Sequence, residues 1–144
     1  MTPQDLLTCA RTYLGVRYRH QGRTAFGLDC VGLLIRVAHD LQLTDFDLTG
    51  YGRHPDPVQM TTLLATHLRK QPGGTDPRPA DALLLADGPY PCHLALVGDQ
   101  GEPFSLIHAW LPARKVVEHR ASPDWLAKIR GLYRFPQLSE GLTS

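Results

Sequence analysis

The sequence predicts an α+β domain in which helices from the first half of the chain pack on one antiparallel β-sheet. Apolar residues recur at helical spacing up to about residue 68, and short apolar runs separated by turn clusters follow from residue 82. At 144 residues the chain is close to the commonest size of a single domain. We therefore expect one domain over residues 1–144, with a core at about 3–136 and a C-terminal tail at 137–144.

Two helices are expected before residue 42. The first begins after Thr2, a good N-cap residue, and ends at Gly15. Residues 15–28 have no sustained apolar period and are expected to form a loop. A second helix covers about residues 29–41, and the apolar residues of its core-facing stripe are Cys30, Leu34, Val37 and Leu41. This spacing places Cys30 in the first turn of that helix.

A third helix and the strands follow. Asp56 is expected to cap a helix that ends at the turn formed by residues 72–74. An antiparallel meander is then expected, with strands at residues 82–85, 93–97, 104–108 and 115–118. A short helix capped by Ser122 leads to a last strand at residues 131–135.

The composition excludes several classes of function. The net charge is +1, so the chain lacks the broad positive field of a nucleic-acid-binding module. No apolar run reaches the ~18 residues of a membrane-spanning helix, so membrane insertion is not expected. Three scattered cysteines suit neither a disulfide scaffold nor a structural zinc site. We expect a protein made in the cytoplasm without a signal peptide, and without a metal or cofactor.

Cys30 is the candidate nucleophile. At a helix N-terminus the unpaired N–H groups and the helix dipole favour an anion, so we expect a pKa lowered to about 3.5–7.5. A thiolate also needs an imidazole that moves protons. His93 opens one predicted strand and His108 lies near the end of the next, so antiparallel pairing brings the two imidazoles together. A thiol, a base and a residue that orients the base are what acyl transfer requires.

Structural roles compete with this interpretation. A cysteine on an amphipathic helix is more often a small buried hydrophobic residue, and the residues alone leave both roles open. Cys9 is expected to fill the core. Cys92 adjoins His93, but neighbouring strand residues point to opposite faces, so the two cannot easily bind one zinc ion. The remaining histidines are expected on the surface or in loops: His20, His39, His54, His67 and His119.

Several motifs resemble those of the NlpC/P60 cysteine peptidases. Residues 15–22 (GVRYRHQG) and 27–33 (GLDCVGL) are similar to the nucleophile region of that family. Residues 79–84 (PADALL) resemble its proline–glycine–aspartate strand start, and residues 93–98 (HLALVG) resemble its histidine strand. The motifs occur in the family's order and span about residues 5–136.

The resemblance implies a papain-like α+β fold and cleavage of peptidoglycan stem peptides, typically between γ-D-glutamate and a diamino acid. It implies Cys30 as nucleophile, His93 as general base and acid, and His108 as the residue that orients His93. Tyr18 matches a tyrosine that helps to form the oxyanion or substrate pocket. Asp29 matches an acidic residue that holds the free amine of the stem peptide. Loop packing and helix capping are the alternative roles of Tyr18 and Asp29.

The sequence departs from the family pattern at two positions. The serine that usually follows the nucleophile is Val31 here, which removes a hydroxyl that could contact substrate. Ala80 replaces the glycine that usually precedes Asp81, and we expect this replacement to be neutral.

Residues 107–109 (IHA) and 131–136 (GLYRFP) look most like the phage and prophage tail-associated branch of the family. The resemblance therefore implies delivery in a virion or phage-like tail, tail proteins as partners, and action in the cell wall or periplasm. Two other functions remain open. One is a structural tail-assembly module of the same fold without turnover, and the other is a related thiol amidase or acyltransferase.

Overall fold

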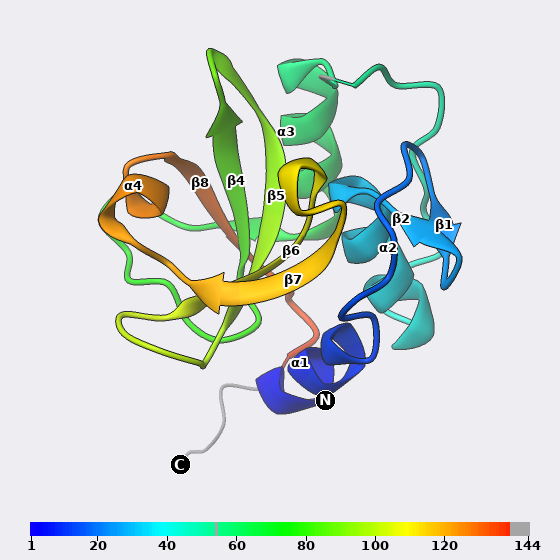
Figure 1. Cartoon of the computed structure of the whole chain (residues 1–144). Coiled ribbons are helices and arrows are strands. Elements are labelled where there is room, and N and C mark those ends of the chain that lie inside the picture. Colours follow the sequence, from blue (N-terminus) through cyan, green and yellow to red (C-terminus); the bar gives the residue numbers. More distant parts are fainter. Residues whose placement is uncertain (54, 139–144) are drawn as a thin grey trace.

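The computed structural model describes residues 1–53 and 55–138, with helices α1 to α3 on one side of an antiparallel sheet (Figure 1). The helices of this part are α1 (Pro3–Arg11), α2 (Cys30–Asp40), α3 (Pro57–His67) and the short α4 (Pro123–Leu126), with a 3₁₀ turn η1 (Leu111–Ala113). The strands are β1 (Arg23–Thr24), β2 (Gly27–Leu28), β3 (Arg69–Lys70), β4 (Ala82–Asp87), β5 (Tyr90–Gly98), β6 (Ser105–Trp110), β7 (Lys115–Arg120) and β8 (Ile129–Arg134). The predicted α+β class is confirmed.

Capping residues begin the first and third helices as expected. Thr2 and Asp5 form a capping box at α1, with the two reciprocal N–H to side-chain oxygen distances at 3.2 and 2.9 Å. The Asp56 carboxylate accepts from the Val58 N–H at 2.8 Å at the start of α3. Ser122 is the N-cap residue of α4, as expected, but its side chain makes no cap hydrogen bond, and backbone bonds hold the single turn. None of the helices in the described ranges has the length and apolar content needed to cross a bilayer.

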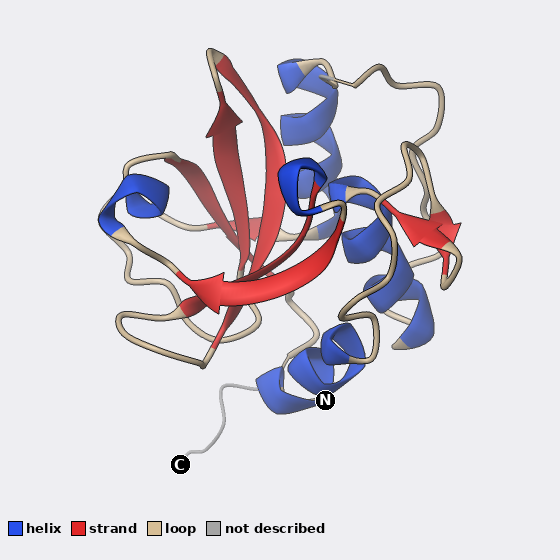
Figure 2. Ribbon diagram, viewed as in Figure 1, coloured by secondary structure: helices blue, strands red, loops and turns tan. Residues whose placement is uncertain are grey.

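The main sheet has the strand order β3-β8-β4-β5-β6-β7 (Figure 2). Strands β4 to β7 form the expected meander, whereas β8 returns to pair with the other side of β4. The third helix ends at His67, earlier than expected, because the chain becomes extended at Leu68. Arg69 and Lys70 then pair with β8, which gives that strand a second neighbour.

Both faces of the sheet are covered. Along β4, Leu84 packs in the main core with α1, α2 and α3, whereas Leu83 and Leu85 pack in a smaller core on the opposite face, beside α4. A strand that is buried on both faces is expected to be apolar, as β4 is from Ala82 to Ala86. The same alternation places Cys92 of β5 in the main core and Ala95 in the smaller one.

The segment before α2 is attached to the edge of the main sheet. Residues 15–28, expected to be a loop, contain β1 and β2, which pair with each other. Before them, the Gly15 N–H donates to the Val116 carbonyl and the Tyr18 N–H donates to the Arg114 carbonyl, both at 2.9 Å. These bonds hold the start of α2 close to β7.

Ala80 occupies the left-handed region, with φ of 75°. This conformation costs a residue with a Cβ roughly 1–2 kcal/mol. Burial of one methyl group offsets about 0.8 kcal/mol of that cost. We expected the replacement of the family's glycine by Ala80 to be neutral. It is not, because it strains the backbone before Asp81.

Candidate active site

A cavity of about 250 Å³ lies between the first turn of α2, β5, the end of β6 and α4. Cys30 from α2 and His93 from β5 both line it, and Tyr18 from the segment before α2 forms part of the same wall. The structure therefore brings three of the expected site residues to one cavity.

Asp29 holds the start of the helix that carries Cys30. Its Oδ1 accepts from the Gly32 N–H at 2.7 Å, which makes Asp29 the N-cap of α2. Its Oδ2 accepts from the Gln21 N–H at 2.7 Å and from the Tyr51 hydroxyl at 2.6 Å. Asp29 is 2% exposed, and its side chain is directed to these donors rather than to the cavity wall.

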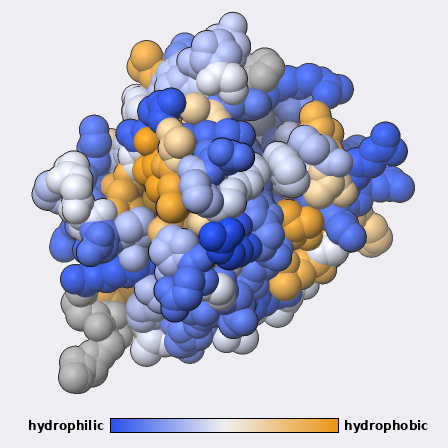
Figure 3. Space-filling view, turned by 60° about the vertical axis from the view of Figure 1, so that its left-hand side comes forward, coloured by the Kyte–Doolittle hydropathy of each residue, from blue (hydrophilic) through white to orange (hydrophobic). Residues whose placement is uncertain are grey.

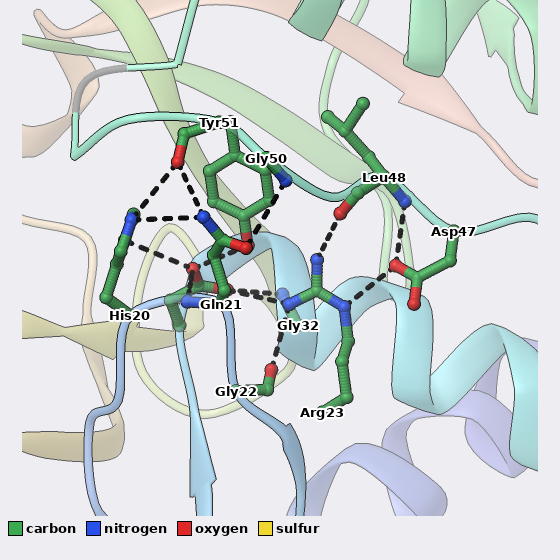
Figure 4. A network of polar contacts seen from close by, with 10 residues as sticks. His20, Gln21, Gly22, Arg23, Gly32, Asp47, Leu48, Gly50 and Tyr51 are labelled. Atoms are coloured by element: carbon green, nitrogen blue, oxygen red, sulfur yellow. Dashed lines mark hydrogen bonds and ion pairs between the residues drawn. The ribbon is translucent and has the colours of Figure 1, made fainter.

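Arg23 extends this network away from the helix (Figure 4). Its Nη1 lies 3.3 Å from Asp29 Oδ1, its Nε lies 2.8 Å from Asp47 Oδ1, and its Nη2 donates to the Leu48 carbonyl at 2.6 Å. The Asp29 carboxylate is thus paired with Arg23 and hydrogen-bonded within the protein. Helix capping, the alternative role of Asp29, accounts for its position.

His93 and His108 are in direct contact. Their rings come from the adjacent antiparallel strands β5 and β6, and His93 Nε2 lies 2.7 Å from His108 Nδ1. His108 is fully buried, with 0% exposure. This is the juxtaposition that the strand order predicts.

His119, expected on the surface or in a loop, is partly exposed and lies on β7 in contact with His108. Their Nε2 atoms are 2.8 Å apart. His108 is paired with Val117 in the register of β6 and β7, so His119 is a diagonal neighbour on the same face. The alternation of side chains along β7 puts residues 117 and 119 on the same face. Which residue of β6 they meet depends on the register of the hairpin, which the sequence does not show.

Among the other histidines, His20 lies in a turn, as expected, and also lines the cavity, with its Nε2 3.1 Å from the Tyr51 carbonyl. His39 and His67 lie on α2 and α3 rather than in loops. His54 lies outside the described residues.

The Cys30 thiol is protonated at neutral pH. Burial, and then the charge of Asp29, raises the pKa of Cys30 to about 12, although the N–H groups of Leu94 and Val31 favour the thiolate. The expected fall of this pKa to about 3.5–7.5 is wrong. Desolvation together with a neighbouring carboxylate outweighs the effect of the helix N-terminus.

His93 is neutral at the same pH. Burial lowers the pKa of His93 to about 4, while the Asp87 charge raises it and the Lys128 charge lowers it further. Burial, followed by the neighbouring His93 and His119, lowers the pKa of His108 to about 2. The resting site therefore contains a protonated thiol and a neutral imidazole.

Tyr18 and Val31 face different environments. Burial and then the charges of Cys30 and Asp29 raise the pKa of Tyr18, so its hydroxyl stays protonated and can donate into the cavity. Val31 is 0% exposed and packs in the main core. The side chain that follows Cys30 thus points away from the cavity, and a serine here would not bring a hydroxyl to it.

The cavity combines charged and aromatic side chains in its walls. Its walls carry Arg53, Asp87 and Lys128, and the rings of Trp110 and Trp125 meet edge to face with centroids 5.3 Å apart. The face seen in Figure 3 is mostly hydrophilic, with its apolar side chains in separate small groups.

Comparisons with known proteins identify the fold. No protein-family model matches the sequence, and no curated protein matches it. The NlpC/P60 domain of the peptidoglycan hydrolase SagA has a TM-score of 0.62 at 23% identity, over 94% of this chain and all 100% of that domain. An NlpC/P60 family protein from Bacillus cereus has a TM-score of 0.66 at 19% identity, over 94% of this chain and 40% of that protein.

An N-acetylmuramoyl-L-alanine amidase from Bacteroides uniformis has a TM-score of 0.60 at 13% identity, over 94% of this chain and 99% of that one. The chain thus spans nearly the whole of two of these structures and less than half of the third. It adopts the papain-like α+β fold of NlpC/P60 domains.

Proposed function

We propose that this chain is an NlpC/P60 cysteine peptidase that hydrolyses the stem peptides of peptidoglycan. The observation that carries the proposal is that Cys30 and His93 line one cavity, while His93 Nε2 is held 2.7 Å from His108 Nδ1. The motif resemblance and the fold shared with NlpC/P60 domains of peptidoglycan hydrolases support the choice of substrate.

Attack begins with a proton transfer. Since Nε2 of His93 faces His108, Nδ1 is the nitrogen that accepts the Cys30 proton. The sulfur forms a bond to the amide carbon, and the carbonyl oxygen becomes an oxyanion. We assign the hydrogen bonds to that oxygen to the N–H of Cys30, in the first turn of α2, and to the Tyr18 hydroxyl, which lines the same cavity.

The intermediate then collapses. The C–N bond breaks, and the His93 imidazolium gives its proton to the leaving amine. Water enters, loses a proton to His93 and attacks the thioester carbon. The C–S bond breaks, and the proton returns to the Cys30 sulfur. Over the cycle His93 takes one proton from Cys30 and one from water, and it gives one to the leaving amine and one back to the sulfur. The imidazole is therefore neutral again at the end.

The charges of the cavity suit a zwitterionic peptide. Arg53 and Lys128 can pair with the carboxylates of a segment in which γ-D-glutamate is followed by a diamino acid. We propose that the bond between these two residues is the one cleaved. Among the described lining residues the acidic one is Asp87, and we assign to it the contact with an ammonium group of the substrate. Asp29, already bonded to four donors, fixes the helix start instead.

Muropeptide digestion followed by mass spectrometry tests the proposal. Wild-type protein is expected to release fragments cut after γ-D-glutamate, and Cys30→Ala and His93→Ala are expected to release none. Cys9→Ala is the matched control, because Cys9 is a half-buried thiol on α1 outside the cavity. Cleavage by Cys30→Ala would overturn the mechanism, and inactive wild-type protein would favour a non-catalytic tail module.

The same digests distinguish a second candidate. Similarity to an N-acetylmuramoyl-L-alanine amidase favours cleavage at the junction of glycan and stem peptide as the alternative. An amidase would release intact stem peptides with a free N-terminal amine, whereas the proposed peptidase leaves a dipeptide on the glycan.

We further propose that the protein acts from a virion or phage-like tail, with tail proteins as partners, at the cell wall. The support is the resemblance of residues 107–109 and 131–136 to tail-associated members of the family. Mass spectrometry of purified particles from the producing strain is expected to detect the chain in stoichiometric amounts. Its presence only in the particle-free fraction would contradict this assignment.

A further inference from the structure

Three imidazoles form a line from the cavity to a backbone carbonyl. His93 Nε2 lies 2.7 Å from His108 Nδ1, and His108 Nε2 lies 2.8 Å from His119 Nε2. His119 Nδ1 lies 2.9 Å from the Arg120 carbonyl oxygen. The rings come from β5, β6 and β7 in turn.

The carbonyl sets the direction of every hydrogen bond in the line. Since a carbonyl oxygen only accepts, His119 Nδ1 carries a proton and donates to Arg120. In a neutral ring His119 Nε2 then accepts, so His108 Nε2 must donate and His108 Nδ1 must accept. His93 Nε2 consequently donates, and the unprotonated nitrogen of His93 is Nδ1.

We propose that His119 is a positioning residue of the proposed hydrolase, which fixes through His108 the tautomer that leaves Nδ1 of His93 as the proton acceptor. The proposal rests on the proposed function for its kinetic consequence. The tautomers themselves are a property of the folded protein and can be measured without any substrate.

Burial makes this relay necessary. His108 is 0% exposed, with the Trp110 ring stacked at 5.8 Å between centroids and the Trp125 ring at 5.1 Å. Enclosed by these rings, His108 needs protein groups at both nitrogens. Burial also keeps the pKa of His108 well below its ordinary value, so the ring stays neutral and cannot donate from both nitrogens.

The arrangement does not suit a metal ion. Two nitrogens bound to one tetrahedral zinc at about 2.0–2.1 Å would be roughly 3.3 Å apart and would converge on the ion. Here the nitrogens face each other in pairs at 2.7 and 2.8 Å. In residues 1–53 and 55–138, no three His, Cys, Asp or Glu side chains are grouped to hold a metal.

Histidine ¹⁵N chemical shifts in the wild-type protein provide the first test. We expect His119 protonated at Nδ1 and both His108 and His93 protonated at Nε2, at a pH near neutrality. A His93 ring protonated at Nδ1 would overturn the proposal. This measurement needs neither a variant nor an active enzyme, so its result is independent of whether the proposed function holds.

Two variants separate hydrogen bonding from ring packing. His119 also touches the Trp125 ring, with centroids 5.2 Å apart, so His119→Phe keeps a ring but loses the acceptor. His119→Gln loses the ring but keeps an acceptor oxygen. We expect His119→Phe to mix the tautomers of His93 and to lower kcat at least about 10-fold with little change in KM. His119→Gln is expected to retain the wild-type tautomers and most of kcat.

A donor-only variant and a control complete the set. His119→Lys can only donate, so it is expected to invert the tautomers of both His108 and His93 and to reduce kcat further. Lys115→Gln, at an exposed position of the same strand, is expected to match the wild type. Unchanged tautomers in His119→Phe, or equal losses in His119→Phe and His119→Gln, would show that His119 acts only by packing.

Discussion

The Tyr51 hydroxyl lies 2.6 Å from the Asp29 carboxylate and joins the segment between α2 and α3 to the start of α2, the helix that carries Cys30. Tyr51 is 5% exposed, and its carbonyl accepts from Gln21 Nε2 at 2.8 Å. The guanidinium carbon of Arg23 lies 5.5 Å from the centre of its ring. Tyr51 thus helps to fix the position of Cys30, although Tyr51 does not line the cavity.

Removing this hydroxyl should destabilise the protein. In Tyr51→Phe the Asp29 carboxylate loses one donor, and a buried hydrogen bond to a charged group is worth about 1.5–3 kcal/mol. We expect the free energy of unfolding, measured in urea, to fall by that amount. Tyr90→Phe is the control, because Tyr90 is 47% exposed, and its effect is expected to stay within about 0.5 kcal/mol. Equal effects of the two variants would show that the Tyr51 hydroxyl contributes nothing special.

Gly32 packs directly against the segment before α2. A Cβ placed there would lie 2.0 Å from the Gly22 carbonyl oxygen, a backbone atom that cannot move aside. We expect Gly32→Ala to lower the free energy of unfolding by about 2–4 kcal/mol and to displace the first turn of α2. Thermal unfolding, together with the reactivity of Cys30 toward a thiol reagent, measures both effects.

The matched control is Gly73→Ala. A Cβ at Gly73 would meet no atom within 4 Å, so the change is expected to stay within about 0.5 kcal/mol. If Gly32→Ala were as mild as Gly73→Ala, the close approach of the two segments would not constrain the helix start.

Local signals made the helices and the meander predictable. Thr2 and Asp56 cap their helices through side-chain bonds to nearby N–H groups. Short turns between consecutive strands favour their antiparallel pairing. The strand β3 and the return of β8 beside β4 were missed, because these pairings join distant segments. The sequence around Lys70 contains no local sign of its partner.

Some contacts within the candidate site were predictable from the sequence, and its electrostatics were less so. The strand order predicted the contact of His93 with His108, whereas His119 required the register of β6 and β7. The pKa of Cys30 was predicted in the wrong direction, because a helix N-terminus is visible in a sequence and burial beside the Asp29 carboxylate is not. Long-range packing decides such shifts.

Val31 is expected to tolerate serine poorly. It is 0% exposed in the main core, so Val31→Ser removes apolar contacts and buries a hydroxyl, at a cost of about 2–3 kcal/mol. Since the side chain points away from the cavity, the muropeptide products should not change. Val58→Ser, at a position that is 69% exposed, is the control for stability. A new product pattern in Val31→Ser would show that its side chain reaches the substrate.

Asp87 and Lys128 are expected to move the pKa of His93 in opposite directions from its value of about 4. The Asp87 charge favours the imidazolium and the Lys128 charge opposes it, so Asp87→Asn should lower this pKa and Lys128→Met should raise it. Because both side chains are exposed and screened by salt, each shift should be smaller than about one pH unit. The neutral ring is the base, so activity is lost as the pH falls through this pKa, and the acid limb of kcat/KM should follow the same two directions. NMR titration of His93 measures the shifts directly, and two shifts of the same sign would show that altered burial, rather than charge, dominates.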